Sequence, residues 1–362
     1  MGHRTVLVAG ASGIVGRAAM SRFAGRADTR VIALSRRRPD LDGDYRFLPL
    51  DLSDAVACES AAASLGDVTH VIYAALYEKP GVIRGWRETD QMLANLAMLR
   101  SLMTPLLKVA SGLRHVTLLQ GTKAYGAHLR PIAVPARERW PRDGHANFYW
   151  LQEDWLRAAQ NGRDWTFTIL RPQIICGHGM GSPLNLLSAI GAYAAILKAR
   201  GESLHWPGGP AYLVEATCAD LLARAIDWAG TAAAAAGETF NVTSGDVFTW
   251  HNVWPAIARS LGMQPGEARP LRLAQDMPSR EPEWAAIVRR HGLRSGSLKQ
   301  FVGDSFFYAD FSFACGRDKA PPPALVSTVK IRQAGFGDCV DTEDMFTAWF
   351  AALRQMKLLP TE

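Results

Sequence analysis

Near its beginning the chain reads Val8-Ala9-Gly10-Ala11-Ser12-Gly13-Ile14-Val15-Gly16. An apolar run, Thr5–Ala9, leads into these residues, and Arg17–Ala24 follows them with apolar residues at helical spacing. In such a strand–turn–helix unit the first glycine permits a tight turn, the second lets the backbone approach a pyrophosphate, and the third lets helix and strand pack closely. The helix N-terminus supplies N–H donors and a positive dipole. The pattern predicts a dinucleotide site, with an ordinary glycine-rich β-to-α turn as the alternative.

The alternation of strand and helix continues through the first half of the chain. Short apolar runs bounded by Gly, Ser or charged residues are typical of buried strands. These runs are Thr5–Ala9, Arg30–Leu34, His70–Ala74, His115–Leu119 and Thr166–Leu170. The segments between them, such as Thr89–Met103, carry apolar residues at helical spacing. We therefore predict an α/β fold, a Rossmann-type doubly wound parallel sheet with helices on both faces.

The regular alternation of strands and helices ends after about Cys176. Beyond it, glycine and proline residues interrupt the predicted elements. The Pro321-Pro322-Pro323 run lies in this part, and Glu238–Val242 is typical of one more strand that returns to the sheet. We predict a Rossmann domain over residues 1–175 plus about 215–250. A smaller, mostly helical substrate-binding region is expected over about 176–214 and 251–362.

Composition excludes several classes of protein. The chain has 362 residues, 48% hydrophobic and 20% charged, which suits a large buried core and excludes disorder. Its net charge of +6 favours an anionic ligand. No stacking groove of interleaved basic and aromatic residues is present, so no nucleic-acid partner is expected. The five widely spaced cysteines predict a reducing compartment and no metal site.

The location of the protein is also predicted from what the sequence lacks. The start of the chain has no charged n-region followed by a long apolar segment, as a signal peptide would have. No stretch of about 18 uninterrupted apolar residues is present to span a membrane. We expect a cytoplasmic protein without a membrane partner, either a monomer or a homodimer.

The end of the second predicted strand indicates which dinucleotide is bound. A carboxylate at this position would bind the ribose 2′-hydroxyl of NAD. The chain instead reads Leu34-Ser35-Arg36-Arg37-Arg38, and guanidinium groups beside a hydroxyl suit a 2′-phosphate. We therefore predict NADPH/NADP+ as the cofactor, with a solvated basic turn as the alternative.

Further residues are expected to contact the cofactor at the ends of the other strands. Asp51 and Leu52 lie where such folds contact the adenine edge, although Asp51 equally suits a helix cap. The full predicted set is Gly10, Ser12, Gly13, Ile14, Val15, Gly16, Ser35, Arg36, Arg37, Asp51, Leu52, Ala74, Ala75, Gln120, Pro172 and Ile174.

The usual catalytic motif of short-chain dehydrogenases is absent. In that motif a Lys four residues after a helical Tyr lowers the pKa of the phenol and binds the ribose. None of the eight tyrosines has such a Lys, and Tyr149, the best placed on a helix, has Glu153 at that position. Lys123 follows a central strand, where ligands of open parallel sheets lie, and is a substitute cation. Taken alone, a lysine at this place is more often a surface residue, and a tyrosine such as Tyr149 is more often a core or interface residue than a catalytic one.

Several motifs, in order along the chain, match one known family. Residues 147–154 read Asn-Phe-Tyr-Trp-Leu-Gln-Glu-Asp, against the family's Asn-Phe-Tyr-Tyr-x-x-Glu-Asp. Residues 121–125 match its Gly-x-Lys-x-Tyr, residues 171–177 its Arg-Pro followed by Ile-x-Gly, and residues 240–250 its Phe-Asn-Val-x-x-Gly-Asp-Val-Phe-x-Trp. The chain thus resembles, over nearly its whole length, the progesterone 5β-reductase and iridoid synthase-like (PRISE) family of atypical, extended short-chain dehydrogenases.

The resemblance implies NADPH-dependent 1,4-reduction of an activated C=C bond in an enone or enal, a small hydrophobic carbonyl compound. Negative charge then accumulates on the carbonyl oxygen, which needs a preorganised donor. Tyr149 would be that donor, and Lys123 would supply positive potential near the enolate, the ribose or Tyr149. Water would supply the α-carbon proton. Glu153, one turn from Tyr149, either contacts it or is a structural carboxylate.

The chain departs from the family at two places. Trp150 replaces the second Tyr of the family's pair, which leaves Tyr149 as the phenol, with Tyr125 as the next candidate. Residues 126–129 read Gly-Ala-His-Leu instead of the plant enzymes' Gly-Pro-Phe, so the plant substrates are not carried over. The aromatics available for a substrate wall, or alternatively for the core, are Trp206, Tyr212, Phe336 and Phe346.

Two other functions remain open at this point. One is an extended short-chain carbonyl reductase, epimerase or dehydratase, which the missing Tyr-x-x-x-Lys motif disfavours. The other is a non-catalytic NADP-sensing protein. The presence of both Lys123 and Tyr149 argues against a sensor, because binding the cofactor alone requires neither.

Overall fold

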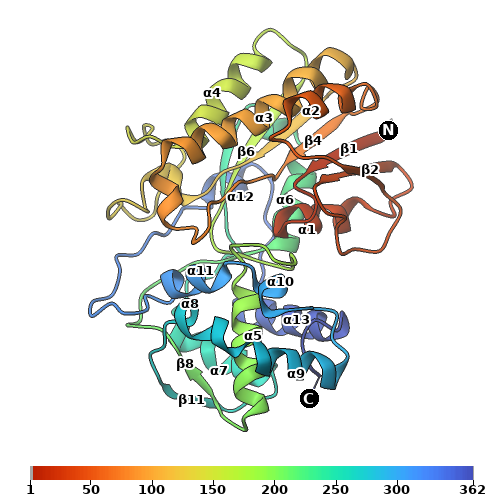
Figure 1. Ribbon diagram of the computed structural model, residues 1–362. Helices are drawn as coiled ribbons and strands as arrows, with labels where there is room; N and C mark the ends of the chain where they lie inside the picture. Colours follow the sequence, from red (N-terminus) through yellow and green to blue (C-terminus); the bar gives the residue numbers. More distant parts are fainter. Residues whose placement is uncertain (1–2, 362) are drawn as a thin grey trace.

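The computed structural model describes residues 3–361, and its main feature is a seven-stranded parallel sheet. The strand order is β10-β6-β5-β4-β1-β2-β3, so the direction of winding reverses between β1 and β4. The strands are β1 (Arg4–Ala9), β2 (Thr29–Ser35), β3 (Arg46–Pro49), β4 (His70–Tyr73), β5 (His115–Leu119), β6 (Thr166–Pro172) and β10 (Thr239–Val242). The predicted doubly wound Rossmann sheet is confirmed (Figure 1).

The five apolar runs of the sequence correspond to β1, β2, β4, β5 and β6, each within two residues of the prediction. The predicted returning strand is also present, because Thr239 in β10 pairs with Ile169 in β6. Side chains alternate between the two faces along a strand. In β1, Val6 and Val8 join one hydrophobic core, whereas Leu7 and Ala9 join the other. Both faces are therefore covered, which explains why these runs contain few polar residues.

Helices form a layer on each face of the sheet. On one face α1 (Ile14–Phe23) packs against α6 (Ala219–Ala229). On the other face α2 (Ala55–Ala62) packs against α3 (Thr89–Val109), which in turn packs against α4 (Phe148–Gln160). Figure 1 shows the second layer at the top of the molecule, over the sheet.

A second, mostly helical part surrounds α5 (Leu186–Ala199), in which residues 186–197 are all buried. Its other elements are β8 (Leu204–Trp206), α7 (Trp250–Ser260), β11 (Pro265–Ala268), α8 (Leu273–Asp276), α9 (Glu281–His291), α10 (Leu298–Val302), α11 (Ser305–Ser312) and α13 (Thr342–Gln355). They lie below the sheet in Figure 1. Of the helices described in residues 3–361, none has both the length and the apolar character needed to cross a bilayer.

The two parts share one continuous hydrophobic core, which includes Ile14 of α1 and Phe346 of α13. Short elements connect them, namely the paired strands β7 (Ile175–Cys176) and β9 (Thr217–Cys218). The helix α12 (Val329–Gln333) returns to pack against β10 at the edge of the sheet. The exact division into a Rossmann domain and a substrate-binding region therefore remains a prediction.

The glycine-rich turn places α1 very close to the sheet. Gly10 has φ +82°, a left-handed conformation that favours glycine, and a Cβ there would lie 2.7 Å from the backbone of Ala74. A Cβ on Gly16 would lie 2.1 Å from the carbonyl oxygen of Gly10. The first turn of α1 therefore fits against the turn only with glycine at both positions.

We predict that Gly16→Ala destabilises the protein, because the methyl group meets backbone atoms that cannot rotate away. The expected loss is about 1–3 kcal/mol in the free energy of unfolding, measured by urea denaturation. Gly112→Ala is the matched control, since a Cβ there meets no atom within 4 Å. Equal losses in the two variants would contradict this account of the turn.

Candidate active site

One cavity, of about 1370 Å³, lies at the carboxyl ends of the central strands. Residues directly after β1, β2, β4 and β5 line it, as does Pro172 at the end of β6, which is the usual ligand position in an open parallel sheet. The structure brings both predicted catalytic residues, Tyr149 and Lys123, into this cavity. All of the predicted cofactor residues also line the cavity except Gly16. Gly16 instead packs against the backbone of Gly10 in the glycine-rich turn.

The cavity begins at the N-terminus of α1. Ile14 and Val15, the first residues of the helix, line the cavity, and Gly13 offers no side chain to cap it. The first N–H groups of a helix have no partner within the helix, so they remain available as donors for an anion. The glycine turn and these donors fit the pyrophosphate of a dinucleotide.

Two of the three consecutive arginines lie at the cavity. Arg36 and Arg37 line it, and Arg37 Nη2 donates to the Met180 carbonyl oxygen at 3.4 Å. Arg38 instead lies with its guanidinium 5.1 Å from the ring centroid of Phe47 and 5.7 Å from that of Tyr45. The basic turn therefore presents two guanidinium groups beside Ser35, rather than three.

Asp51 lines the cavity and does not cap the following helix. The cap of α2 is Asp54, whose side chain accepts a hydrogen bond from the Ala57 amide at 2.9 Å. Asp51 accepts from the Ser53 amide and hydroxyl at 3.0 and 2.8 Å. These bonds, together with the charge of Arg36, lower the pKa of the Asp51 carboxyl. The capping alternative for Asp51 was wrong because the N-cap position lies three residues later, at Asp54.

Gln120 lines the cavity, but its amide is already bonded to protein groups at both ends. Its Nε2 donates to Glu153 at 3.0 Å and to the Tyr149 carbonyl oxygen at 3.3 Å, while its Oε1 accepts from Arg171 Nε at 2.8 Å. Ile174, also in the cavity wall, has φ +38°. A β-branched residue rarely adopts this conformation, so the backbone is strained at this wall.

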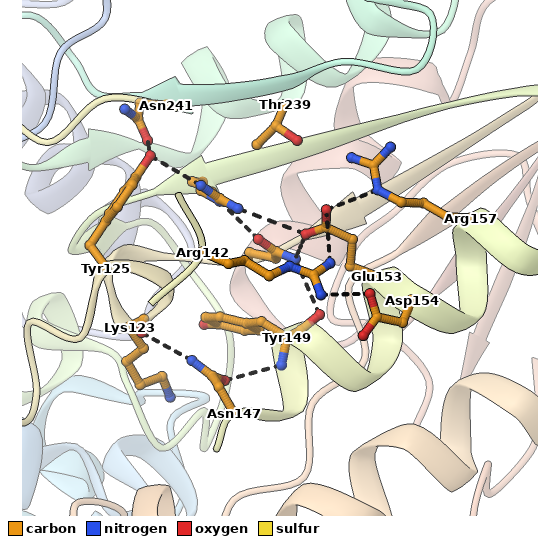
Figure 2. A network of polar contacts seen from close by, with 12 residues as sticks. Lys123, Tyr125, Arg142, Asn147, Tyr149, Glu153, Asp154, Arg157, Thr239 and Asn241 are labelled. Carbon is orange, nitrogen blue, oxygen red and sulfur yellow. Dashed lines mark hydrogen bonds and ion pairs between the residues drawn. The ribbon is translucent and has the colours of Figure 1, made fainter. Parts of the chain in front are cut away.

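Asn147 joins the two segments that carry the catalytic candidates. Its Oδ1 accepts from the Tyr149 amide at 3.0 Å and caps α4, while its Nδ2 donates to the Lys123 carbonyl oxygen at 3.0 Å (Figure 2). Lys123 lies in the short 3-10 helix Thr122–Tyr125 that follows β5. Its Nζ is 5.7 Å from the centroid of the Tyr149 ring. The lysine therefore reaches the tyrosine from a different element, not from the same helix.

The environment of Tyr149 keeps its phenol protonated. The side chain is buried, and burial, followed by the negative charge of Glu78, raises the pKa of Tyr149. Its hydroxyl lies beside Gly121, where a Cβ would be 3.2 Å from the phenol oxygen. Tyr149 is therefore suited to donate a hydrogen bond in the cavity near neutral pH.

Glu78 is the site residue that sequence reasoning missed. It lies in the loop after β4, its side chain is only 1% exposed, and its Oε1 is 3.6 Å from Lys123 Nζ. Trp86 Nε1 and Gln91 Nε2 donate to its carboxylate at 3.2 and 2.8 Å. Its position in the loop that follows an apolar strand was the one available signal, the same kind of signal that identified Lys123.

Glu153 belongs to a structural network next to α4. It accepts from Arg157 Nε at 3.0 Å and forms an ion pair with Arg142 at 3.2 Å, in addition to its bond from Gln120. Figure 2 shows Arg142 and Arg157 on the side of α4 where Glu153 and Asp154 lie. The structural alternative for Glu153 fits these contacts, since none of them involves the Tyr149 hydroxyl.

Tyr125 and Trp150 lie outside the cavity wall. The Tyr125 hydroxyl donates to Asn241 Oδ1 at 2.7 Å and accepts from Arg171 Nη1 at 3.2 Å. The Trp150 ring packs under the guanidinium group of Arg142, 4.7 Å from its centroid. Tyr125 is therefore not placed to replace Tyr149 as a donor, and Trp150 lies apart from the reacting groups.

The aromatic wall of the cavity differs from the one suggested by sequence. Of the four candidates, Tyr212 lines the cavity, whereas Trp206, Phe336 and Phe346 are buried in the hydrophobic core. The aromatic residues of the wall that sequence reasoning missed are Tyr73, Tyr77, Trp86, Phe148, Tyr308 and Phe311. The last two share one face of α11, a short helix whose position relative to the cavity depends on long-range packing.

A comparison with known protein families identifies the family of this chain. The model of the PRISE-like Rossmann-fold domain matches residues 56–360. The chain belongs to this family. The match begins after the glycine-rich turn, so the assignment of that turn depends on its own geometry.

Curated relatives are similar over nearly the whole chain. The (S)-8-oxocitronellyl enol synthase of Nepeta racemosa is 30% identical, with 98% of this chain and 92% of the relative covered. The 3-oxo-Δ4,5-steroid 5β-reductase of Arabidopsis thaliana is 29% identical with the same coverage. A short-chain dehydrogenase of Penicillium aethiopicum is 28% identical, with 99% of both chains covered.

Solved structures of low sequence identity share the fold. The UDP-glucose 4-epimerase of Thermotoga maritima superposes with a TM-score of 0.68 at 17% identity, over 97% of this chain and 99% of that one. The enzyme WbmH of Bordetella bronchiseptica superposes with a TM-score of 0.65 at 16% identity, over 98% of this chain and 99% of that one. The extended fold is thus common to enzymes with other substrates, and the fold alone does not determine the reaction.

Proposed function

We propose that this protein is an NADPH-dependent oxidoreductase that reduces activated C=C bonds, by 1,4-reduction of enones or enals. The observation that carries the proposal is that the Tyr149 phenol and Lys123 lie together in one cavity with the glycine-rich turn and the N-terminus of α1. Family membership supports it, since the relative from Arabidopsis thaliana is named as a reductase of a 3-oxo-Δ4,5-steroid, which is an enone.

Residues at the carboxyl ends of β1, β2 and β3 would hold the cofactor. The Gly10–Gly16 turn and the N-terminus of α1 would bind the pyrophosphate, and Arg36 and Arg37 would bind a ribose 2′-phosphate. A bound nicotinamide supplies the hydride that goes to the β-carbon of the substrate. Asp51, next to Arg36, would lie at the adenine edge.

Tyr149 would bind the substrate carbonyl. As negative charge develops on that oxygen, a donor already aimed at it stabilises the transition state without reorganisation. Lys123 adds positive potential to the same region, and water supplies the proton for the α-carbon. Trp86, Phe148 and Tyr308 offer an apolar wall that excludes water around the rest of the substrate.

The direct test is cofactor oxidation with a panel of small enones and enals, followed by the absorbance of the reduced nicotinamide. We expect turnover with NADPH and a product reduced at the C=C bond, as identified by mass spectrometry and NMR. NADH should support much slower turnover. Reduction of the carbonyl group alone, or no turnover with any member of the panel, would overturn the proposed reaction.

The cofactor preference should depend on two arginines. The double variant Arg36→Ala, Arg37→Ala should lose about 1–3 kcal/mol of NADPH binding for each charge-assisted bond removed, while NADH binding changes little. Fluorescence titration of both cofactors measures the difference. Arg38→Ala is the matched control, because this guanidinium lies over Phe47 and outside the cavity. A wild-type protein that uses NADH equally well would contradict the assignment.

Tyr149→Phe should impair reduction and leave the NADPH dissociation constant nearly unchanged, because the hydroxyl is assigned to the substrate. Loss of one such donor costs roughly a hundredfold to a thousandfold in kcat. Lys123→Ala should be at least as harmful and should also weaken cofactor binding. Trp150→Phe serves as the control, since this ring contacts Arg142 and not the cavity. Full activity of Tyr149→Phe would remove the donor role from this residue.

A further inference from the structure

The loop after β4 carries a carboxylate, Glu78, to which the proposed reaction gives no task. It lies at the cavity wall with its side chain nearly inaccessible to solvent. Removing a carboxylate from water is costly unless a partner compensates for the lost hydration. Its compensating groups are Lys123 Nζ at 3.6 Å and the donors Trp86 Nε1 and Gln91 Nε2.

The ammonium group of Lys123 is also largely removed from water and needs partners that compensate for its lost hydration. Its Nζ lies 4.3 Å from the ring centroid of Trp86 and 5.5 Å from that of Phe148, in addition to the ring of Tyr149. Aromatic faces attract a cation but do not replace its hydration. Burial lowers the pKa of Lys123, whereas the charge of Glu78 raises it again. The ammonium form in this aromatic cage therefore depends on the neighbouring carboxylate.

The other titratable and charged groups around Lys123 do not take over this role. Burial, followed by the charge of Lys123, lowers the pKa of His128 to about 4, so the imidazole is neutral near pH 7. Tyr149 keeps its proton, as argued above. Arg87, which donates to the His128 carbonyl oxygen at 3.0 Å, carries a like charge. Within residues 3–361, the ion pair with Glu78 is the one that Lys123 forms.

Glu78 is itself held in place from two sides. Trp86 donates to the carboxylate through its indole N–H and presents its ring face to the ammonium, so one residue contacts both members of the pair. Gln91 is also fixed, because its Oε1 accepts from the Lys79 amide at 2.9 Å while its Nε2 donates to Glu78. The carboxylate therefore has a defined position relative to the lysine.

We propose that Glu78 is a positioning residue that keeps Lys123 protonated and fixed in front of Tyr149. The proposal deepens the function proposed above and relies on the role given there to Lys123. Glu78 acts through the lysine and needs no contact with the substrate. Its removal should therefore change the pH range in which Lys123 carries a charge, and not only the rate of turnover.

The test is Glu78→Gln in the full chain without cofactor, with the protonation of Lys123 followed by trace acylation with acetic anhydride across pH. Mass spectrometry of the Lys123 peptide gives the midpoint. Removing an adjacent negative charge lowers the pKa of an ammonium, by about one unit or more. Acylation near neutral pH should then rise roughly tenfold, and the basic limb of the kcat profile should move to lower pH. A merely structural role would change the rate without moving either midpoint.

Glu88→Gln is the matched control, because this partly exposed carboxylate lies in the same segment but pairs with Lys79. Its midpoint for Lys123 should equal that of the wild type. If Glu78→Gln does not fold, Lys123→Met tests the coupling from the other side, since loss of the ammonium must raise the pKa of Glu78, measured by carboxyl ¹³C NMR. An unchanged Lys123 midpoint in Glu78→Gln, or an unchanged Glu78 pKa in Lys123→Met, overturns the proposal.

These outcomes are separate from those of the proposed function. Acylation uses neither cofactor nor substrate, so a shifted midpoint stands even if no enone is reduced. Conversely, enone reduction by Tyr149 stands if the midpoint does not move, and Lys123 then holds its charge without Glu78.

Discussion

The backbone contact between Gly16 and Gly10 determines how closely α1 lies on the sheet, and the site depends on that contact. It places the first residues of α1 at the wall of the cavity, at the ends of the strands. The first residue of α1, Ile14, also packs against the segment that contains Gly177 and Gly179 and leads to the second part of the chain. A Cβ on Gly179 would lie 2.9 Å from the Ile14 amide, and one on Gly177 would lie 2.8 Å from the Ile14 side chain. The proposed phosphate-binding turn and the packing of the second part are thus positioned by one turn of helix.

Beyond this turn, the site contains two opposite charges on side chains that are largely removed from solvent. A buried ammonium and a buried carboxylate are each unfavourable alone and tolerable together. Here the pair is built from the ends of two neighbouring strands, since Lys123 follows β5 and Glu78 follows β4. Tyr149 lies in the first turn of α4, just after the N-cap of that helix, and its phenol remains neutral beside the pair. A charged and an uncharged donor can therefore coexist within one cage of aromatic rings.

The sequence predicts the features of the molecule that arise from local patterns. The strands, the glycine turn and the placement of Lys123 after a central strand follow from hydrophobic runs and turn residues. Glu78 and Trp86 lie in the loop of residues 74–88, whose path has no periodicity, so their contacts with Lys123 were not predictable. Arg38 was also not predictable, because its position over Phe47 depends on how β3 packs beside β2. The misassigned cap at Asp51 shows that two nearby aspartates are distinguished only by where the helix begins.

The Trp at position 150, where the family has a second Tyr, is explained by the side of α4 on which it lies. Its ring contacts the guanidinium groups of Arg142 and Arg171. Arg142 pairs with Glu153, and Arg171 Nε donates to Gln120, so the ring packs against the network that fastens α4 to the sheet. The phenol of Tyr149 points into the cavity from the preceding position, because successive helical residues differ by about 100° in direction. A phenol at position 150 would therefore face the arginines, and Tyr149 remains at the cavity wall without it.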